Sequence, residues 1–180
     1  MTAAALKILS THALAEVLAA LGPQFERVGG RRLACAYDPS KALRRRIEQG
    51  EDFDVAIATR AAIDALTAAG RIDPRGAADA ARHRRGNAKQ DRARRFGTHR
   101  HAGGARRAEL AVQQISELKP VQGADFVGPL PPDLQVYTTF TAGIAAGCNA
   151  SAEAARFIAM LAAPATAPLI AASGLEAPAR

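Results

Sequence analysis

The first seventy residues alternate short apolar runs with segments of helical spacing, and this alternation constrains the fold more than any other feature. The strands are predicted at 6–9, 32–37 and 53–58, and the helices that follow them at 12–21, 41–49 and 61–69. Strands that alternate with helices form a parallel sheet with right-handed crossovers. The sequence therefore predicts an α/β fold.

Hydroxyl groups follow each of the three predicted strands. They belong to Ser10 and Thr11, to Ser40, and to Thr59 after Ala58. Because the carboxyl ends of parallel strands meet at one edge of a sheet, we expect these side chains to lie together beside helix N-termini. Each hydroxyl could simply cap its helix, or the hydroxyls and the backbone N–H groups could surround a small anion. The residues alone leave both interpretations open.

The basic charge of the chain is concentrated in one segment. The formal net charge is +7, but residues 75–107 hold eleven Arg and Lys against two Asp, so this segment carries +9 and the remainder −2. The segment lacks Leu, Ile, Val and Met, which predicts a mobile stretch that builds no core. Its arginines could bind nucleic acid through phosphates. Aromatic residues make up only 4% of the chain, so bases would find few stacking surfaces, and we expect no specific nucleic-acid partner.

Ordered structure is predicted again from residue 108 onwards. A strand should run through Val112 and end at Gln113 and Gln114. Further strands are predicted at 124–127 and 135–141, and helices at 151–161 and 167–172.

No motif in the sequence indicates an enzyme. The nucleophile elbow, the zinc-binding HExxH, the Walker loop and the dinucleotide fingerprint are all absent. Cys35 and Cys148 have no neighbour at metal-ligand spacing, and we expect two buried free thiols rather than a disulfide. We therefore expect no catalytic residue, no metal and no cofactor. A cytoplasmic anion sensor, or an enzyme without a recognisable catalytic site, would also fit such an α/β unit.

The N-terminal sequence carries no signal for export. No basic residues precede the first apolar run, and no stretch approaches the roughly 20 apolar residues that span a membrane. If the start is correct, the residues alone predict a protein that stays in the cytoplasm.

Several blocks of the sequence resemble the bacterial extracellular solute-binding proteins of the molybdate-binding type. The blocks are LKILSTHALAEVLAALGPQFER, SKALRRRIEQGEDFDVAIAT, AELAVQQISELKPVQGADFVGPLPPDLQVYTTFTAGIAAG and SAEAARFIAMLAAPATAPLIAASGLE. The resemblance covers residues 6–74 and 108–176, which is most of the chain. It implies a type II periplasmic binding protein: two α/β lobes, a parallel or mixed sheet flanked by helices, and an oxyanion in the interlobe cleft. It also implies a periplasmic location and a partner in the membrane subunit of an ABC importer; we expect a monomer.

The resemblance assigns ligand binding to particular residues by position. These are Ser10, Thr11, Ser40, Ala58, Thr59, Gln113 and Gln114, the last two standing where the family's molybdate binders have a Val-Tyr pair.

The resemblance also assigns the domains. Residues 1–74 and 137–180 would form lobe one, and 108–136 a hinge and the remnant of a truncated second lobe. Residues 75–107 stand where the family builds most of that lobe, and would be a disordered insert or a frame-shifted segment. A cleft that lacks part of one wall would bind its anion weakly or not at all, because a closed cleft needs donors from both sides.

Overall fold

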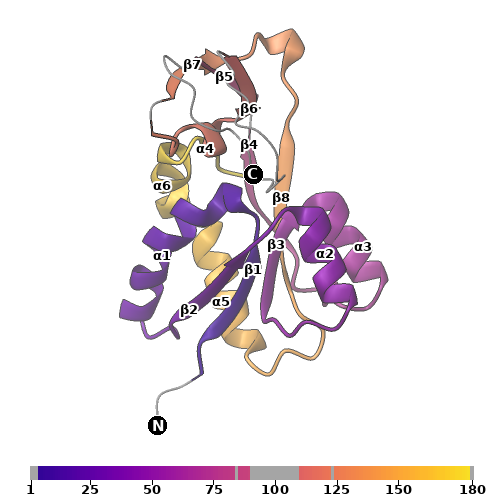
Figure 1. Cartoon of the computed structure of the whole chain (residues 1–180). Coiled ribbons are helices and arrows are strands. Elements are labelled where there is room, and N and C mark those ends of the chain that lie inside the picture. The colour runs from indigo at the N-terminus through magenta and orange to yellow at the C-terminus, as the bar shows by residue number, and fades with distance from the viewer. Residues whose placement is uncertain (1–3, 84, 90–109, 123, 179–180) are drawn as a thin grey trace.

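Two sheets of unequal size organise the chain in the computed structural model, which describes residues 4–83, 85–89, 110–122 and 124–178 (Figure 1). The larger sheet has the strand order β2-β1-β3-β8-β4-β9, and the smaller has the order β6-β5-β7. The larger sheet comprises β1 (Leu6–Ser10), β2 (Leu33–Tyr37), β3 (Val55–Thr59), β4 (Ala78–His83), β8 (Thr138–Ile144) and β9 (Leu175–Glu176). The smaller sheet comprises β5 (Arg85–Lys89), β6 (Leu110–Gln114) and β7 (Asp125–Pro129).

Helices cover both faces of the larger sheet. One face carries α1 (Ala15–Arg27), α5 (Ser151–Leu161) and α6 (Ala167–Ala172), and the other carries α2 (Ser40–Glu48) and α3 (Arg60–Ala68). The remaining segments are α4 (Ile115–Leu118) and the 3-10 turns η1 (His12–Leu14), η2 (Pro132–Leu134) and η3 (Pro164–Thr166).

The sheet is mixed, and its parallel part is the one predicted from the alternating pattern. β1 pairs in parallel with both β2 and β3, whereas β8 runs antiparallel to β3 and to β4. The predicted α/β fold with a mixed sheet flanked by helices is confirmed. The carboxyl ends of β1, β2 and β3 meet at one edge, as expected.

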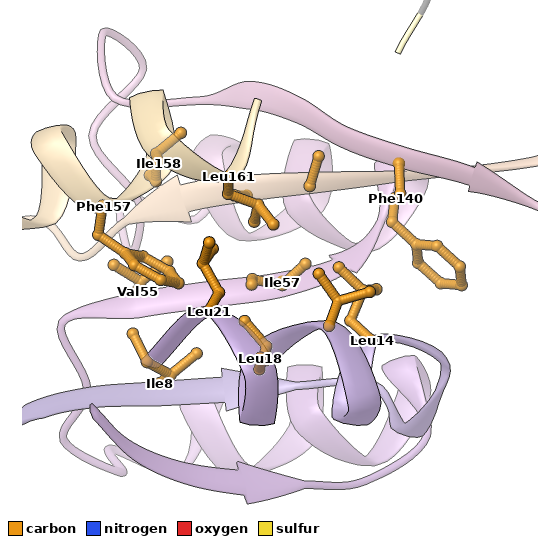
Figure 2. Close-up of a cluster of buried hydrophobic side chains, with 14 of the residues drawn as sticks. Ile8, Leu14, Leu18, Leu21, Val55, Ile57, Phe140, Phe157, Ile158 and Leu161 are labelled. Carbon is orange, nitrogen blue, oxygen red and sulfur yellow. The ribbon is translucent and has the colours of Figure 1, made fainter. Parts of the chain in front are cut away.

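The side chains of the parallel strands alternate between two buried clusters. In β3, Val55 and Ile57 face α1 and α5, while Ala56 and Ala58 face α2 and α3. Figure 2 shows the first cluster, in which Leu18 of α1 and other apolar side chains of α1 and α5 meet over the strands. Helices therefore pack on both faces, which anchors the strand ends between them.

Helix α1 runs further than predicted. The pattern predicted a helix over 12–21 that stops at Gly22 and Pro23, with a second helical turn over 24–28, but a single helix continues to Arg27 with Pro23 inside it. Proline removes one backbone hydrogen bond and costs about 3 kcal/mol in a helix interior. Phe25, one turn after Leu21 on the same buried face, packs edge-on against Phe157 at 5.5 Å between ring centroids. This packing holds the helix across the proline.

Part of the basic segment is folded, which corrects the expectation of a mobile stretch. β4 inserts between β8 and β9, and Ala80 and Ala81 are buried in the core. Small alanine side chains can pack in the core here because the neighbouring strand β8 contributes a large side chain: Ala81 lies opposite Phe140. β4 thus joins the larger sheet, and β5 joins the smaller one. The rest of the predicted insert, 90–107, lies outside the described residues.

Within the described residues, no single helix is long and apolar enough to cross a bilayer. Only α5 taken together with Pro164–Ala172 meets that test, as a pair bent by 56°.

Candidate functional site

The residues that follow β1 and β2 are hydrogen-bonded to neighbouring strands of the larger sheet. Thr11 N–H donates to the Ile57 carbonyl at 3.1 Å, and Asp38 N–H donates to the Ser10 carbonyl at 3.1 Å. Ser10 lies in register with residues of both neighbouring strands. The structure therefore brings the predicted residues of the first three loops to one edge of the sheet.

The hydroxyl groups at this edge do not cap the helices that follow them. η1, α2 and α3 begin after Thr11, Pro39 and Thr59, and none of these three residues makes a side-chain capping bond. Ser40, a predicted cap, is instead the first residue of α2, and its Oγ accepts a hydrogen bond from Thr59 N–H at 3.1 Å. The first-turn N–H groups of α2 and α3 thus receive no side-chain cap.

Thr11 carries an unsatisfied hydroxyl at the centre of this edge. Ser10 is fully buried, and its Oγ donates to the Thr11 carbonyl at 3.2 Å. Thr11 is only 6% exposed, and its Oγ1 has no hydrogen-bond partner among the described residues. A buried hydroxyl without a partner costs about 1–3 kcal/mol. Its presence beside two uncapped helices favours the anion-site interpretation over the capping one.

Gln113 and Gln114 approach the site from the smaller sheet. They end β6, and α4 follows Gln114 directly and contacts η1, which follows Thr11 directly. Gln113 is exposed, and its Oε1 accepts the N–H of Gln114 at 3.1 Å. The Oε1 atom of Gln114 is buried and lacks a partner in the part of the chain that the structure describes. The structure therefore buries the side-chain oxygen of the half-buried Gln114 and leaves Gln113 at the surface.

Sequence reasoning missed Ser116. It lies in α4, is only 5% exposed, and its Oγ has no partner among the described residues. The sequence does not show that a serine at the start of a short helix is buried without a partner, because its burial depends on the packing of α4 in the folded protein.

Two charged groups at this edge, Arg60 and Asp38, form ion pairs. Arg60, the first residue of α3, forms an ion pair with Asp79 of β4, which also accepts a hydrogen bond from Thr141 Oγ1 at 3.0 Å. Asp38, in the loop after β2, pairs with Arg46 at 3.1 Å between Oδ2 and Nη1. Arg60 is therefore already engaged by a carboxylate, and hydroxyl and N–H groups are the candidate donors for an anion at this edge.

One half-buried acid lies close to the site. Burial raises the pKa of the Glu117 carboxyl on α4, and the nearby His12 of η1 partly opposes this rise. The His12 ring in turn lies 6.0 Å from the ring of Tyr37 between centroids. Glu117 thus places an ionisable carboxyl where α4 meets η1.

We expect Glu117→Gln to stabilise the protein slightly at neutral pH. The free energy of unfolding should rise by no more than about 0.5 kcal/mol. The pKa of Glu117 is higher in the folded than in the unfolded chain, so its ionisation disfavours folding and its contribution to stability falls as the pH rises through this range. Thermal unfolding of both proteins between about pH 4 and about pH 7 should show the advantage of the variant growing with pH. A difference independent of pH would contradict the prediction.

The fold combines a larger mixed sheet covered by helices with a smaller three-stranded sheet, and polar groups gather at one edge of the larger sheet. The profile described as bacterial extracellular solute-binding protein matches residues 6–88 and 85–176. The chain belongs to the family of bacterial extracellular solute-binding proteins.

Solved structures share the fold at low sequence identity. The chain is similar to the substrate-binding domain assigned to a molybdenum ABC transporter of Clostridium difficile, with 12% identity, a TM-score of 0.75, and 97% of this chain and 99% of that one covered. The periplasmic molybdate-binding protein of Azotobacter vinelandii is 14% identical, with a TM-score of 0.75, and the match covers 97% of this chain and 100% of that one. The sulfate-binding protein SubI of Mycobacterium tuberculosis is 10% identical, with a TM-score of 0.70, and the match covers 96% of this chain and 86% of that one. No curated protein matches the chain in sequence.

Proposed function

We propose that the chain is the substrate-binding component of an ABC-type importer and that it binds a small, molybdate-like oxyanion. The observation that carries the proposal is the Thr11 hydroxyl, which is buried, has no partner among the described residues, and lies at the edge where the parallel strands end. Structural neighbours that bind molybdate and sulfate support the same ligand class. Ser10, Ser40, Ala58, Thr59, Gln113 and Gln114 complete the proposed site.

The hydroxyl and backbone N–H groups of the proposed site favour an oxyanion as the ligand. Hydroxyl and backbone N–H groups donate to oxyanions, and the nearby Arg60 and Asp38 are already engaged with Asp79 and Arg46. An anion held by neutral donors needs no counter-charge from the protein. These donors support an oxyanion as the ligand class.

The wider role follows from family membership. We propose a monomeric protein that works in the periplasm, delivers the anion to the membrane subunit of the importer, and catalyses no reaction. The larger sheet with its helices would be lobe one, and the smaller sheet with α4 would be lobe two.

Isothermal titration of the folded protein with molybdate, tungstate, sulfate and phosphate tests the proposal. We expect saturable binding of at least one of these anions with a stoichiometry of one. Binding should also raise the thermal unfolding temperature, because a ligand that binds only the folded state stabilises it. If protein whose folding is confirmed by circular dichroism binds none of the four anions, the proposed ligand class would be contradicted.

A further inference from the structure

We propose that Ser116 is a ligand-binding residue of the smaller lobe, and that its hydroxyl and the Thr11 hydroxyl hold the anion from two sides. This inference rests on the proposed function. It assigns the donor that the smaller lobe contributes to the site.

The buried hydroxyl groups of the described residues divide into two kinds. Most of them donate to an acceptor close by in the chain or across the sheet: Ser10 to Thr11, Thr141 to Asp79, Thr166 to Met160, and Ser173 to Leu169. Thr11 and Ser116 alone among the buried serines and threonines described have no partner for the side-chain oxygen. In folded proteins the large majority of buried polar atoms have a hydrogen-bond partner, so each buried hydroxyl without one requires an explanation.

The two unpartnered hydroxyls lie on segments that touch. Thr11 immediately precedes η1, Ser116 is the second residue of α4, and α4 contacts η1. The segments come from different sheets, since η1 follows β1 and α4 follows β6. One ligand between them would satisfy both hydroxyls and link the two lobes.

The C-terminal part of lobe one holds α4 in place. Lys119 Nζ donates to the Ala172 carbonyl at 2.9 Å, and Leu118 is buried. Gly174, at φ +79°, lies so close that a Cβ there would come within 3.2 Å of Ser116 N and 2.7 Å of Ile115 Cγ2. The absence of a side chain at 174 therefore lets α4 pack closely, and the position of Ser116 is fixed before any ligand binds.

The chemistry of the pair specifies the ligand. Each hydroxyl can donate one hydrogen bond, so the ligand must offer at least two acceptor oxygens within a short span. A tetrahedral oxyanion does so, and charge makes these bonds stronger than bonds to a neutral acceptor. An apolar ligand would leave both hydroxyls unsatisfied.

Ser116→Ala, with Ser173→Ala as a matched control, tests the inference. Both are buried serines, but the Ser173 hydroxyl already donates to the Leu169 carbonyl at 3.2 Å. We expect Ser116→Ala to weaken binding of the tightest of molybdate, tungstate, sulfate and phosphate by roughly 10- to 100-fold, the effect of losing a bond to a charged group. The unfolding temperature of the ligand-free protein should stay unchanged or rise. Ser173→Ala should lower that temperature and leave the affinity unchanged.

Three results would overturn the inference. Unchanged affinity in Ser116→Ala, with anion binding intact in the unsubstituted protein, would remove Ser116 from the site and leave the proposed function standing. A lower unfolding temperature of ligand-free Ser116→Ala would show that the hydroxyl has a partner within the protein. An unsubstituted protein that binds none of the four anions would overturn the proposed function and this inference together.

Discussion

Phe157→Ala lowers the free energy of unfolding by about 3–5 kcal/mol, the usual cost of truncating a buried phenylalanine. The ring is 0% exposed and packs edge-on against Phe25 of α1, so its removal opens a cavity where α1 and α5 meet over the sheet (Figure 2). Ile8 and Val55 belong to the same cluster and hold β1 and β3, the strands that end at the candidate site. Urea-induced unfolding followed by far-ultraviolet circular dichroism measures the change.

Phe126→Ala on β7 is the matched control for this change. The same atoms are removed, but Phe126 is 39% exposed and lies on the smaller sheet. We expect a smaller loss of about 1–2 kcal/mol, since less apolar surface leaves a buried environment. Equal losses for the two variants would mean that the cluster under α1 and α5 is not the stabilising core.

The elements that depend on local pattern were predictable from the sequence. Helix α5 was predicted at 151–161 and is found there, and β1 and β3 differ from prediction by one or two residues at their ends. These segments bury one clear face, so their periodicity is visible without knowledge of the partner. β4 was not predictable because its buried residues are alanines, and its place in the sheet depends on Phe140 of β8.

The two walls of the candidate site differ in the same way. Ser10, Thr11, Ser40 and Thr59 follow parallel strands, and topology alone brings such strand ends together. Ser116 belongs to a four-residue helix whose position depends on close packing against Gly174. A contact between segments so distant in sequence leaves no periodic signal. The order of the strands therefore determines one wall, and tertiary packing determines the other.

Thr11→Val should weaken anion binding by roughly 10- to 100-fold while leaving the ligand-free protein as stable as before, or more stable. Valine keeps the shape and the branching at Cβ, and it suits the extended backbone of Thr11 at φ −73° and ψ 153°. The variant removes a buried hydroxyl that costs the free protein about 1–3 kcal/mol while unpaired. The bound anion loses a charge-assisted hydrogen bond of similar size. Isothermal titration and thermal unfolding measure the two effects separately.

Thr166→Val is the matched control, because it makes the same chemical change at a buried threonine whose hydroxyl is satisfied. Thr166 Oγ1 donates to the Met160 carbonyl at 2.7 Å at the turn between α5 and α6. Its loss should cost about 1 kcal/mol of stability and leave anion affinity unchanged. Opposite signs of the stability effect in the two variants would identify Thr11 as a residue kept for its ligand, since an unpaired buried hydroxyl lowers the stability of the free protein. A loss of stability in Thr11→Val as large as in the control would instead give Thr11 a structural role.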